Sequence, residues 1–341
     1  MRTTTSFAGT DIRKPLAALV ICAGAVLMSS AAVLAETLGP QAVNTAELSG
    51  PSGKGRSGVL SVAVILKSEV LLDRAGFSPG VIDGKIGTNY QKAVAAFQHA
   101  NGMHPSGQLD AQTWHCLNAT STEPVLIEYE IQPTDVKGPF NTSIPSSLEK
   151  QAALKGLHHT GPQELLAEKF HVEPALLTRL NPKESFKAAG SKILVPNVAS
   201  KPTQAKVTKV VVSKTERTVR ALDGEGKLIA FYPASVGSKE RPSPSDTLAI
   251  RSVTENPTYR YSPQLNFKGV KAQHSFDIAA GPKNPVGSMW IDLGDGYGIH
   301  GTPAPQNIGK TESHGCIRLA NWDATALGKM VRKGTRVDFI N

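Results

Sequence analysis

The chain has 341 residues, 40% of them hydrophobic and 19% charged, and its formal net charge is +9. This composition excludes a disordered chain, and the length suffices for two or three domains. The positive charge favours anionic envelope polymers or lipid headgroups as partners. We expect no nucleic acid binding, because the sequence has no basic helix and no aromatic-basic array.

The N-terminal residues 1–35 predict a secretory signal peptide. Basic residues flank the start of an apolar segment over residues 16–27, and a small-residue cleavage pattern ends at Ala35. An uncleaved anchor is the alternative. No later apolar run is long enough to span a bilayer, so we expect no transmembrane segment after signal cleavage. Residues 36–58 are rich in Gly, Pro and Ser and predict a flexible leader.

Residues 59–118 predict a small domain of three helices. The first helix begins near Val62 and ends before Gly76, and the second stops at Gly102. Asp110 is expected to cap the third, in which Trp114 faces inward.

The amino-acid sequence of this segment is similar to that of the peptidoglycan-binding-like domain family. The resemblance is carried by residues 77–87 (FSPGVIDGKIG), by residues 93–98 (AVAAFQ) and by Thr113-Trp114. It implies binding to the glycan or the stem peptide of a bacterial wall.

Residues 125–197 predict a second module, of α/β type. A short strand near residues 129–131 precedes an amphipathic helix at 164–170. Residues 174–180 and Asn181-Pro182 follow, and a strand at 193–196 closes the segment. This order resembles a LysM module, which implies recognition of glycans that contain N-acetylglucosamine. An extra stretch at residues 137–161 departs from the usual compact module, so a scaffold without sugar binding is an equal alternative.

Residues 206–341 are mostly β, with one clear helix that Asn321 is expected to cap. Strands are expected at residues 207–212, 218–222, 228–232, 247–253, 290–293, 298–300 and 337–340. The predicted fold is therefore multidomain α+β: a three-helix domain, a LysM-like α/β module and a β-rich, β-sandwich-like C-terminal domain.

One thiol in the last domain lies among imidazoles and glycines, in the run Ser313-His314-Gly315-Cys316-Ile317-Arg318. Of the other two cysteines, Cys22 would leave with the signal peptide, and Cys116 lies in the predicted third helix. A Cys116–Cys316 disulfide is one interpretation for an exported chain. Because the two lie in different predicted domains, we favour a nucleophilic Cys316.

A catalytic cysteine is usually activated by a nearby imidazole, because a free thiol is mostly protonated at pH 7. Both His314, two residues before Cys316, and His300, at the end of a predicted strand, could be this base, and spacing alone does not choose between them. Gly315 allows a sharp turn whose amides could form an oxyanion hole. Gly301 could offer its carbonyl to orient His300.

Two other interpretations of these residues are open. His300, His314 and Cys316 could ligate zinc, but paired ligands and an acidic base are missing from the sequence around them. The three could also be packed in a loop without any catalytic role. We expect no metal and no organic cofactor.

The same residues resemble the signature of the L,D-transpeptidase catalytic domain of the YkuD family, over about residues 206–341. The resemblance is carried by His300-Gly301-Thr302, Ile308-Gly309 and residues 313–319, with further matches at 232–237, 241–245, 281–287 and 334–337. It implies a β-rich fold and an acyl enzyme on Cys316. It also implies that His300 is the base, that Gly301 orients it, and that amides of His314, Gly315 and Cys316 bind the oxyanion. Arg318 and Ser313 are then expected to support the site or contact substrate.

The resemblance implies a peptidoglycan tetrapeptide stem as donor. Cys316 would attack the carbonyl of the third residue and release D-alanine, and an amine of another stem would take the acyl group to give a 3-3 crosslink. Water as acceptor would give an L,D-carboxypeptidase, and envelope proteins as acyl acceptors would be anchored to the wall. A non-catalytic wall-binding protein is the alternative from another class. All these interpretations place the chain in the cell envelope, in the periplasm.

Overall fold

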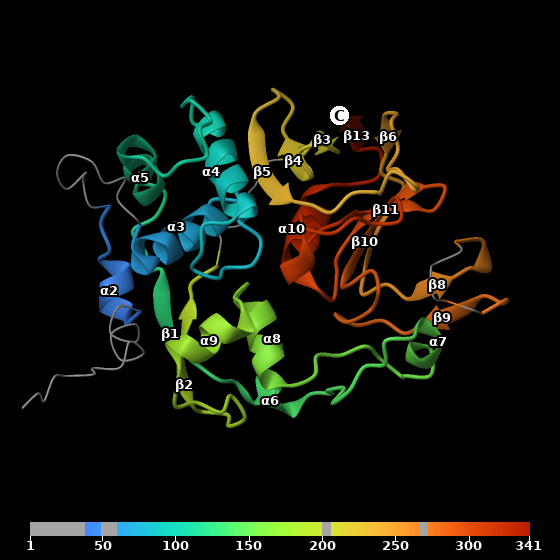
Figure 1. Ribbon diagram of the computed structural model, residues 1–341, viewed down its shortest axis with the longest axis horizontal. Helices are drawn as coiled ribbons and strands as arrows, with labels where there is room; N and C mark the ends of the chain where they lie inside the picture. Colours follow the sequence, from blue (N-terminus) through green and yellow to red (C-terminus); the bar gives the residue numbers. More distant parts are fainter. Residues whose placement is uncertain (1–37, 49–59, 200–205, 266–269, 271) are drawn as a thin grey trace, which may run out of the picture.

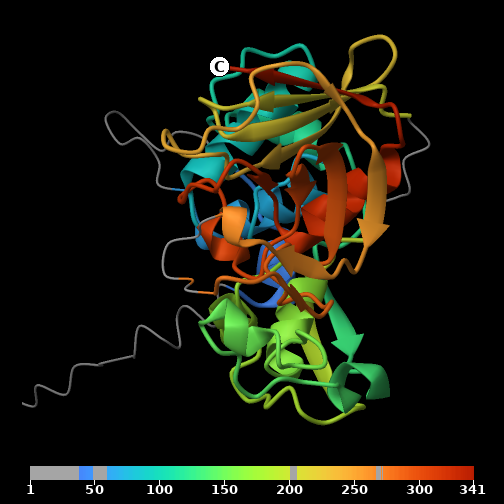
Figure 2. The same ribbon diagram turned by 90° about the vertical axis from the view of Figure 1, so that its right-hand side faces the viewer.

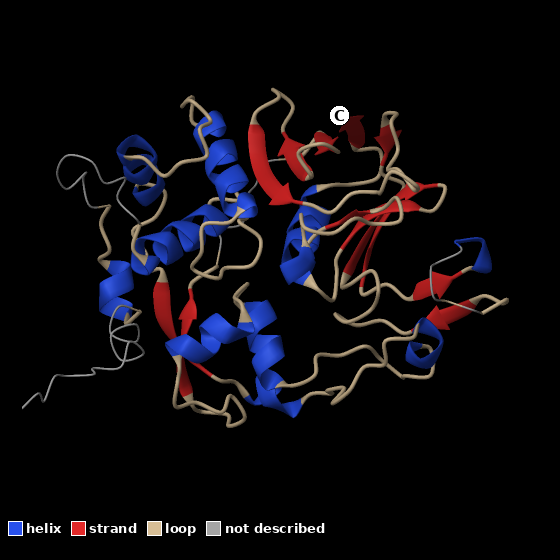
Figure 3. Cartoon of the chain, viewed as in Figure 1, coloured by secondary structure: helices blue, strands red, loops and turns tan. Residues whose placement is uncertain are grey.

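The computed structural model describes residues 38–48, 60–199, 206–265, 270 and 272–341 (Figure 1). The predicted signal peptide at residues 1–35 lies outside these ranges. Within them, no helix combines the length and the apolar character needed to cross a membrane. Figure 3 shows a mostly helical N-terminal part and a strand-rich C-terminal part, as the predicted α+β class requires.

The three helices predicted within residues 59–118 are confirmed. They are α3 (Val62–Arg74), α4 (Thr88–Ala100) and α5 (Ala111–Asn118). Asp110 caps α5 by accepting a hydrogen bond from the Thr113 amide, and Trp114 is buried. Glu69 of α3 is buried and accepts hydrogen bonds from the amides of Asp83 and Gly84, which fixes the Pro-Gly turn between the first two helices.

The prediction of a flexible leader over residues 36–58 was wrong for residues 38–48. Pro40–Asn44 forms helix α2, and Leu38 and Val43 are buried. The Asn44 side chain explains why this segment is ordered. It accepts hydrogen bonds from the amides of Val125 and Leu126 at 2.9 and 2.8 Å and donates one to the Leu126 carbonyl.

The second module contains the predicted strand, helix and closing strand, and three helices that were not predicted. Strands β1 (Leu126–Glu130) and β2 (Lys192–Pro196) form an antiparallel pair. Between them lie helices α6 (Pro133–Lys137), α7 (Leu148–Gln151), α8 (Pro162–Lys169) and α9 (Pro174–Leu180). This module does not have a core of its own. One hydrophobic core runs through α3, α4, α8, α9 and both strands and reaches Phe231.

The C-terminal part contains two larger sheets. The first has the strand order β5-β4-β3-β13-β6 and the second β12-β11-β10-β7. Their bounds are β3 (Lys209–Ser213), β4 (Thr218–Leu222), β5 (Leu228–Pro233), β6 (Leu248–Ala249), β7 (Ser252–Glu255), β10 (Met289–Gly294), β11 (Tyr297–His300), β12 (Ile317–Arg318) and β13 (Arg336–Ile340). Apolar residues of both sheets and of helix α10 (Asn321–Met330) share one core, which agrees with the predicted sandwich-like arrangement. Strands β8 (Tyr259–Tyr261) and β9 (Phe276–Ile278) form a separate pair, and two short 3-10 helices, η1 (Pro263–Leu265) and η2 (Pro305–Asn307), complete the elements.

Two details of this domain differ from the prediction. The single strand expected at residues 247–253 is divided into β6 and β7, because the Ile250 amide bonds to Thr335 while the Arg251 amide bonds to Asp292 in the other sheet. Asn321 does not cap α10. The N-cap is Ala320, and the Asn321 side chain points to residues of α8 and to the loop before β10.

The three parts of the chain are joined by backbone hydrogen bonds. Phe77 pairs with Phe231 at the edge of β5, and Ile82 pairs with Val172 between the two N-terminal modules. The extra stretch 137–161 runs along the lower edge of Figure 1 to α7, beneath β9. There the Leu157 amide donates to Ala280 at 3.0 Å, and the Lys283 amide donates to Leu157 at 3.0 Å. Residues 125–197 are called the βααβ module after β1, the two longer helices α8 and α9, and β2. Figure 2 shows this module extending from the C-terminal domain on one side.

Candidate active site

The pairing of two short strands brings the predicted site residues together. β11 and β12 are parallel neighbours, with Ile299 opposite Ile317 and His300 opposite Arg318. Cys316 directly precedes β12, so the thiol and the imidazole of His300 come from adjacent strands although a long loop separates them in the sequence.

His300 is only 4% exposed, and its Nδ1 lies 2.6 Å from the carbonyl oxygen of Gly301. A carbonyl can only accept, so Nδ1 carries the proton and the neutral ring keeps its lone pair on Nε2. Burial, and then the charge of Arg318, lower the pKa of His300 to about 4. The ring is therefore neutral at pH 7 and able to take a proton at Nε2.

Cys316 is partly buried and not bonded to another cysteine. Its Sγ donates to the Gly296 carbonyl over 3.6 Å. Burial raises the pKa of the Cys316 thiol, although a backbone hydrogen bond with Gly298 and the charge of Arg318 act in the opposite direction. At rest the two groups are thus a thiol and a neutral imidazole, and a thiol in this state can act as a nucleophile only when a base takes its proton.

The loop before Cys316 is held by hydroxyl groups. Gly315 has φ +112°, a conformation that favours glycine. Ser313 is buried, and its Oγ donates to the Cys316 carbonyl and accepts from the Gly315 amide at 3.1 Å. Ser243 Oγ donates to the Gly315 carbonyl at 2.8 Å. In this resting arrangement the Gly315 amide, predicted as an oxyanion donor, is already bonded to Ser313.

The two other predicted side chains differ in their surroundings. Arg318 is half-buried and donates to the Glu312 carbonyl at 3.3 Å; burial lowers its pKa, while the neighbouring Cys316 and Tyr259 raise it. His314 is exposed, and burial of part of its ring, with the charges of Arg318 and Arg241, lowers its pKa. His300, whose tautomer is fixed, therefore fits the role of base better than His314.

Two aromatic residues of the site were missed from the sequence. The Trp290 ring is stacked on His300, with centroids 5.5 Å apart. Tyr259 of β8 has a buried hydroxyl without a hydrogen-bond partner among the described residues, and its charge would interact with Cys316 and Arg318. Trp290 could have been found, because pairing the predicted strands outward from the Gly-Asp-Gly turn places it opposite His300. Tyr259 had no such signal.

The alternative interpretations of the thiol can now be judged. Cys116 and Cys316 are both free, which contradicts a disulfide between them. Within the described residues, no group of three His, Cys, Asp or Glu side chains is placed to hold a metal ion. A cavity of about 1000 Å³ lies elsewhere, at the junction of the three parts, where His171, Trp322 and Asp323 contribute to its wall.

Comparison with known protein families gives a match for the three-helix segment and a match for the C-terminal part. Residues 208–339 match the family model of the L,D-transpeptidase catalytic domain (YkuD). Residues 67–117 match the model of a peptidoglycan binding domain. The first match contains His300, Cys316 and the loop between them.

Curated relatives carry L,D-transpeptidase names. The protein named L,D-transpeptidase YkuD of Bacillus licheniformis is 30% identical over 177 residues, which cover 51% of this chain and 90% of that protein. The protein named L,D-transpeptidase ErfK/SrfK of Escherichia coli is 29% identical over 189 residues, 54% of this chain, and the chain spans 61% of its length. YqjB of Bacillus subtilis, with the same kind of name, is 31% identical over 134 residues, 38% of this chain and 68% of that protein.

Solved structures of similar proteins include L,D-transpeptidase 3 from Mycobacterium tuberculosis with a faropenem-derived adduct. It is 19% identical, covers 43% of this chain and 66% of its own, and has a TM-score of 0.33. The family assignment is based on the sequence matches alone. The chain belongs to the L,D-transpeptidase family, and its C-terminal part is the catalytic domain.

Proposed function

We propose that this chain is an exported peptidoglycan L,D-transpeptidase that acts through an acyl enzyme on Cys316. The observation that carries this proposal is the position of the buried His300. Its Nδ1 donates to the Gly301 carbonyl, so Nε2 is the basic atom. Its strand β11 pairs with β12, which directly follows Cys316. The family's L,D-transpeptidase names support the reaction class.

In the first half-reaction, Sγ of Cys316 attacks the carbonyl carbon of the third residue of a tetrapeptide stem, and its proton passes to Nε2 of His300. Collapse of the tetrahedral intermediate breaks the C–N bond, and His300 returns the proton to the departing amine of D-alanine. Because the Gly315 amide is bonded to Ser313 in the resting structure, we assign the oxyanion first to the amide of Cys316.

In the second half-reaction, an amine of another stem attacks the thioester, and His300 takes a proton from that amine as the C–S bond breaks. The product is a 3-3 crosslink and a regenerated thiol. Water in place of the amine would give a carboxypeptidase, and a protein amine would anchor that protein to the wall. The chemistry at Cys316 is the same in all three cases.

Substrate carboxylates are assigned to Arg318, which is half-buried beside the thiol. The Tyr259 hydroxyl is assigned to a polar group of the bound stem, because a buried hydroxyl without a partner gains a hydrogen bond on binding. Ser313 was predicted to contact substrate; its hydroxyl is used inside the loop, and we assign it to holding Cys316 in place.

The N-terminal modules are assigned to wall binding. The peptidoglycan-binding match supports this for the three-helix domain. For residues 125–197, the βααβ order supports a LysM-like module that binds glycan. Modules held on the wall would raise the effective concentration of a poorly diffusing substrate around Cys316. Such a substrate places the protein in the periplasm or cell envelope.

Intact-protein mass spectrometry tests the proposal. The protein without residues 1–35 and its Cys316→Ala variant are each incubated with a disaccharide tetrapeptide, with a carbapenem as a second acylating probe. We expect an adduct on the wild type alone, together with a crosslinked dimer of stems.

Other results of this experiment would favour one of the alternative functions. Loss of D-alanine without a dimer would move the acceptor to water or to a protein amine. The absence of any adduct, with Cys316 shown to be free and reduced, would contradict the enzyme and leave a wall-binding protein.

A further inference from the structure

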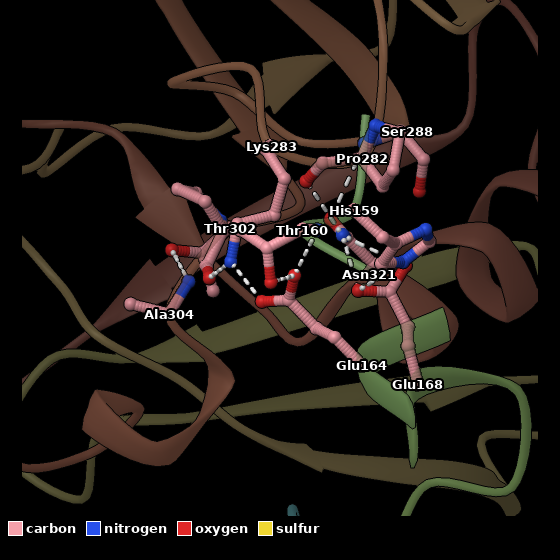
Figure 4. A network of polar contacts seen from close by, with 11 residues as sticks. His159, Thr160, Glu164, Glu168, Pro282, Lys283, Ser288, Thr302, Ala304 and Asn321 are labelled. Atoms are coloured by element: carbon pink, nitrogen blue, oxygen red, sulfur yellow. Dashed lines mark hydrogen bonds and ion pairs between the residues drawn. The ribbon is translucent and has the colours of Figure 1, made fainter. Parts of the chain in front are cut away.

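A chain of polar contacts connects helix α8 of the βααβ module to the catalytic domain (Figure 4). Both carboxylate oxygens of Glu168, on the last turn of α8, accept from Nδ2 of Asn321 at 3.1 Å. Asn321 is 2% exposed, and the same Nδ2 donates to the Pro282 carbonyl at 3.0 Å. The orientation of this buried amide is therefore fixed from the neighbouring module.

The other end of the Asn321 amide reaches the backbone that orients the base. Its Oδ1 accepts from the Ser288 amide at 3.2 Å and lies against Gly301, where an added Cβ would come within 2.2 Å of it. The carbonyl of Gly301 is the group that accepts from Nδ1 of His300. One bonded contact and one packing contact thus separate Glu168 from the residue that holds the imidazole.

A second carboxylate of the same helix holds the segment just after Gly301. Glu164 Oε1 lies 2.6 Å from Nζ of Lys283, which also donates to the Pro303 carbonyl at 2.9 Å. Although burial would raise the pKa of Glu164, hydrogen bonds from Lys283 and Thr160 lower it. The carboxylate is charged at neutral pH and forms a half-buried ion pair.

We propose that helix α8 positions the catalytic base: Glu168 through Asn321, and Glu164 through Lys283, set the Gly301 carbonyl and with it the ring of His300. These carboxylates are positioning residues and touch neither substrate nor thiol. The inference rests on the proposed function only in taking His300 as the base. It makes two residues of the βααβ module, Glu164 and Glu168, part of what the catalytic domain needs for full activity.

The test compares Glu168→Ala, Glu168→Gln and Glu128→Ala in the full protein. Glu128, on β1 of the same module, forms an exposed pair with Lys192 and gives a matched Glu→Ala control. The rate constant for acylation of Cys316 by a carbapenem is measured across pH, with the KM and kcat for the tetrapeptide. The NMR signal of the His300 Nδ1 proton is recorded with ¹⁵N-labelled histidine.

We expect Glu168→Ala to lower the acylation rate constant by on the order of 10- to 100-fold, because a small misplacement of a catalytic group is costly. The KM should change little, and the Nδ1 proton signal should shift or broaden. Glu168→Gln keeps an oxygen that accepts from Asn321, and should restore most of the rate and the wild-type signal. Glu128→Ala should leave both unchanged.

Wild-type acylation and an unmoved His300 signal in Glu168→Ala would overturn the proposal, whatever the change in thermal stability. Lys283→Met removes the contacts of Lys283 with Glu164 and with the Pro303 carbonyl and gives an independent variant. The acylation rate constant and the His300 signal should both change in it. If the wild type fails to crosslink stems, the proposed function fails, but the His300 signal and the rate of Cys316 alkylation by iodoacetamide still test the positioning role.

Discussion

The indole of Trp290 lies on the imidazole of His300, with planes inclined by 24° across the β10–β11 pair. This contact helps to take the imidazole out of water, and burial lowers its pKa to about 4. The unfolded chain has the ordinary histidine pKa of about 6.5. Between these values the unfolded state binds a proton that the folded state does not.

Stability should therefore be lost as the pH falls from about 6.5 towards 4, by roughly 2–3 kcal/mol from His300 alone. Urea unfolding of the wild type and of His300→Gln at pH 7 and 4.5 checks this. The two proteins share all other titrating groups, so the difference between their free energies of unfolding should change by that amount between the two pH values. If this difference is the same at both pH values, His300 is not held neutral by the fold.

Gly301→Ala should destabilise the protein and slow acylation. An added Cβ would lie 2.2 Å from Asn321 Oδ1 and 3.3 Å from the Cα of Gly287. Overpacking of this kind costs about 1–3 kcal/mol. Because the clash is with one side chain, Asn321→Ala in the Gly301→Ala background should cost less than the sum of the single changes. Urea midpoints of the four proteins measure this coupling, and additive effects would contradict it.

Tyr259→Phe should separate stability from activity. The hydroxyl is buried without a hydrogen-bond partner among the described residues, so its removal should leave stability unchanged or raise it by up to about 1 kcal/mol. If the hydroxyl bonds the stem, kcat/KM for the tetrapeptide should fall about tenfold. Thermal unfolding and steady-state kinetics are compared with Tyr261→Phe as the aromatic control on the same strand. A stability loss at unchanged kcat/KM would contradict the assignment.

His171→Ala should loosen the junction of the three parts. His171 Nδ1 lies 3.0 Å from Asp73 of α3, and its ring stacks on Trp322 of α10 at 4.9 Å. Loss of a partly buried hydrogen bond to Asp73 and of a ring contact should cost about 1–3 kcal/mol. Faster hydrogen exchange is expected around the Ile82–Val172 pairing.

Lys192→Ala serves as the control for this junction, because its partner Glu128 is exposed and such pairs contribute little. Unchanged exchange in His171→Ala, equal to that of Lys192→Ala, would mean that the junction is held by the apolar core alone.

Local patterns predicted most of the elements, because the helices and hairpins of this chain follow its own apolar spacing. The strand expected at residues 247–253 shows the limit. Its apolar pattern continues through Ile250, but the chain crosses there from one sheet to the other. Only the backbone hydrogen bonds to Thr335 and Asp292, which belong to different sheets or their ends, reveal that change. Asn321 looked like a cap because of its position, while its real partner, Glu168, lies far away in the sequence.

The two residues predicted to react could be brought together from the sequence more easily than the residues around them. His300 and Cys316 belong to a short motif with a chemical meaning, and their strands pair directly. Tyr259 and Glu168 reach the site through tertiary packing and carry no local pattern. The expected roles in the reaction stay predictions for all the site residues, namely Cys316, His300, Gly301, His314, Gly315, Arg318 and Ser313.

The pairing of Leu157 with Ala280 and Lys283, and of Phe77 with Phe231, has a consequence for recombination between genes. A segment beginning at residue 206 would contain all the predicted site residues, yet it would lack the neighbours of β5 and of the loop after β9. Joining it to a foreign wall-binding module would expose apolar surface and unpaired backbone. A functional exchange would have to carry residues 137–161 and 76–78 along with the catalytic domain.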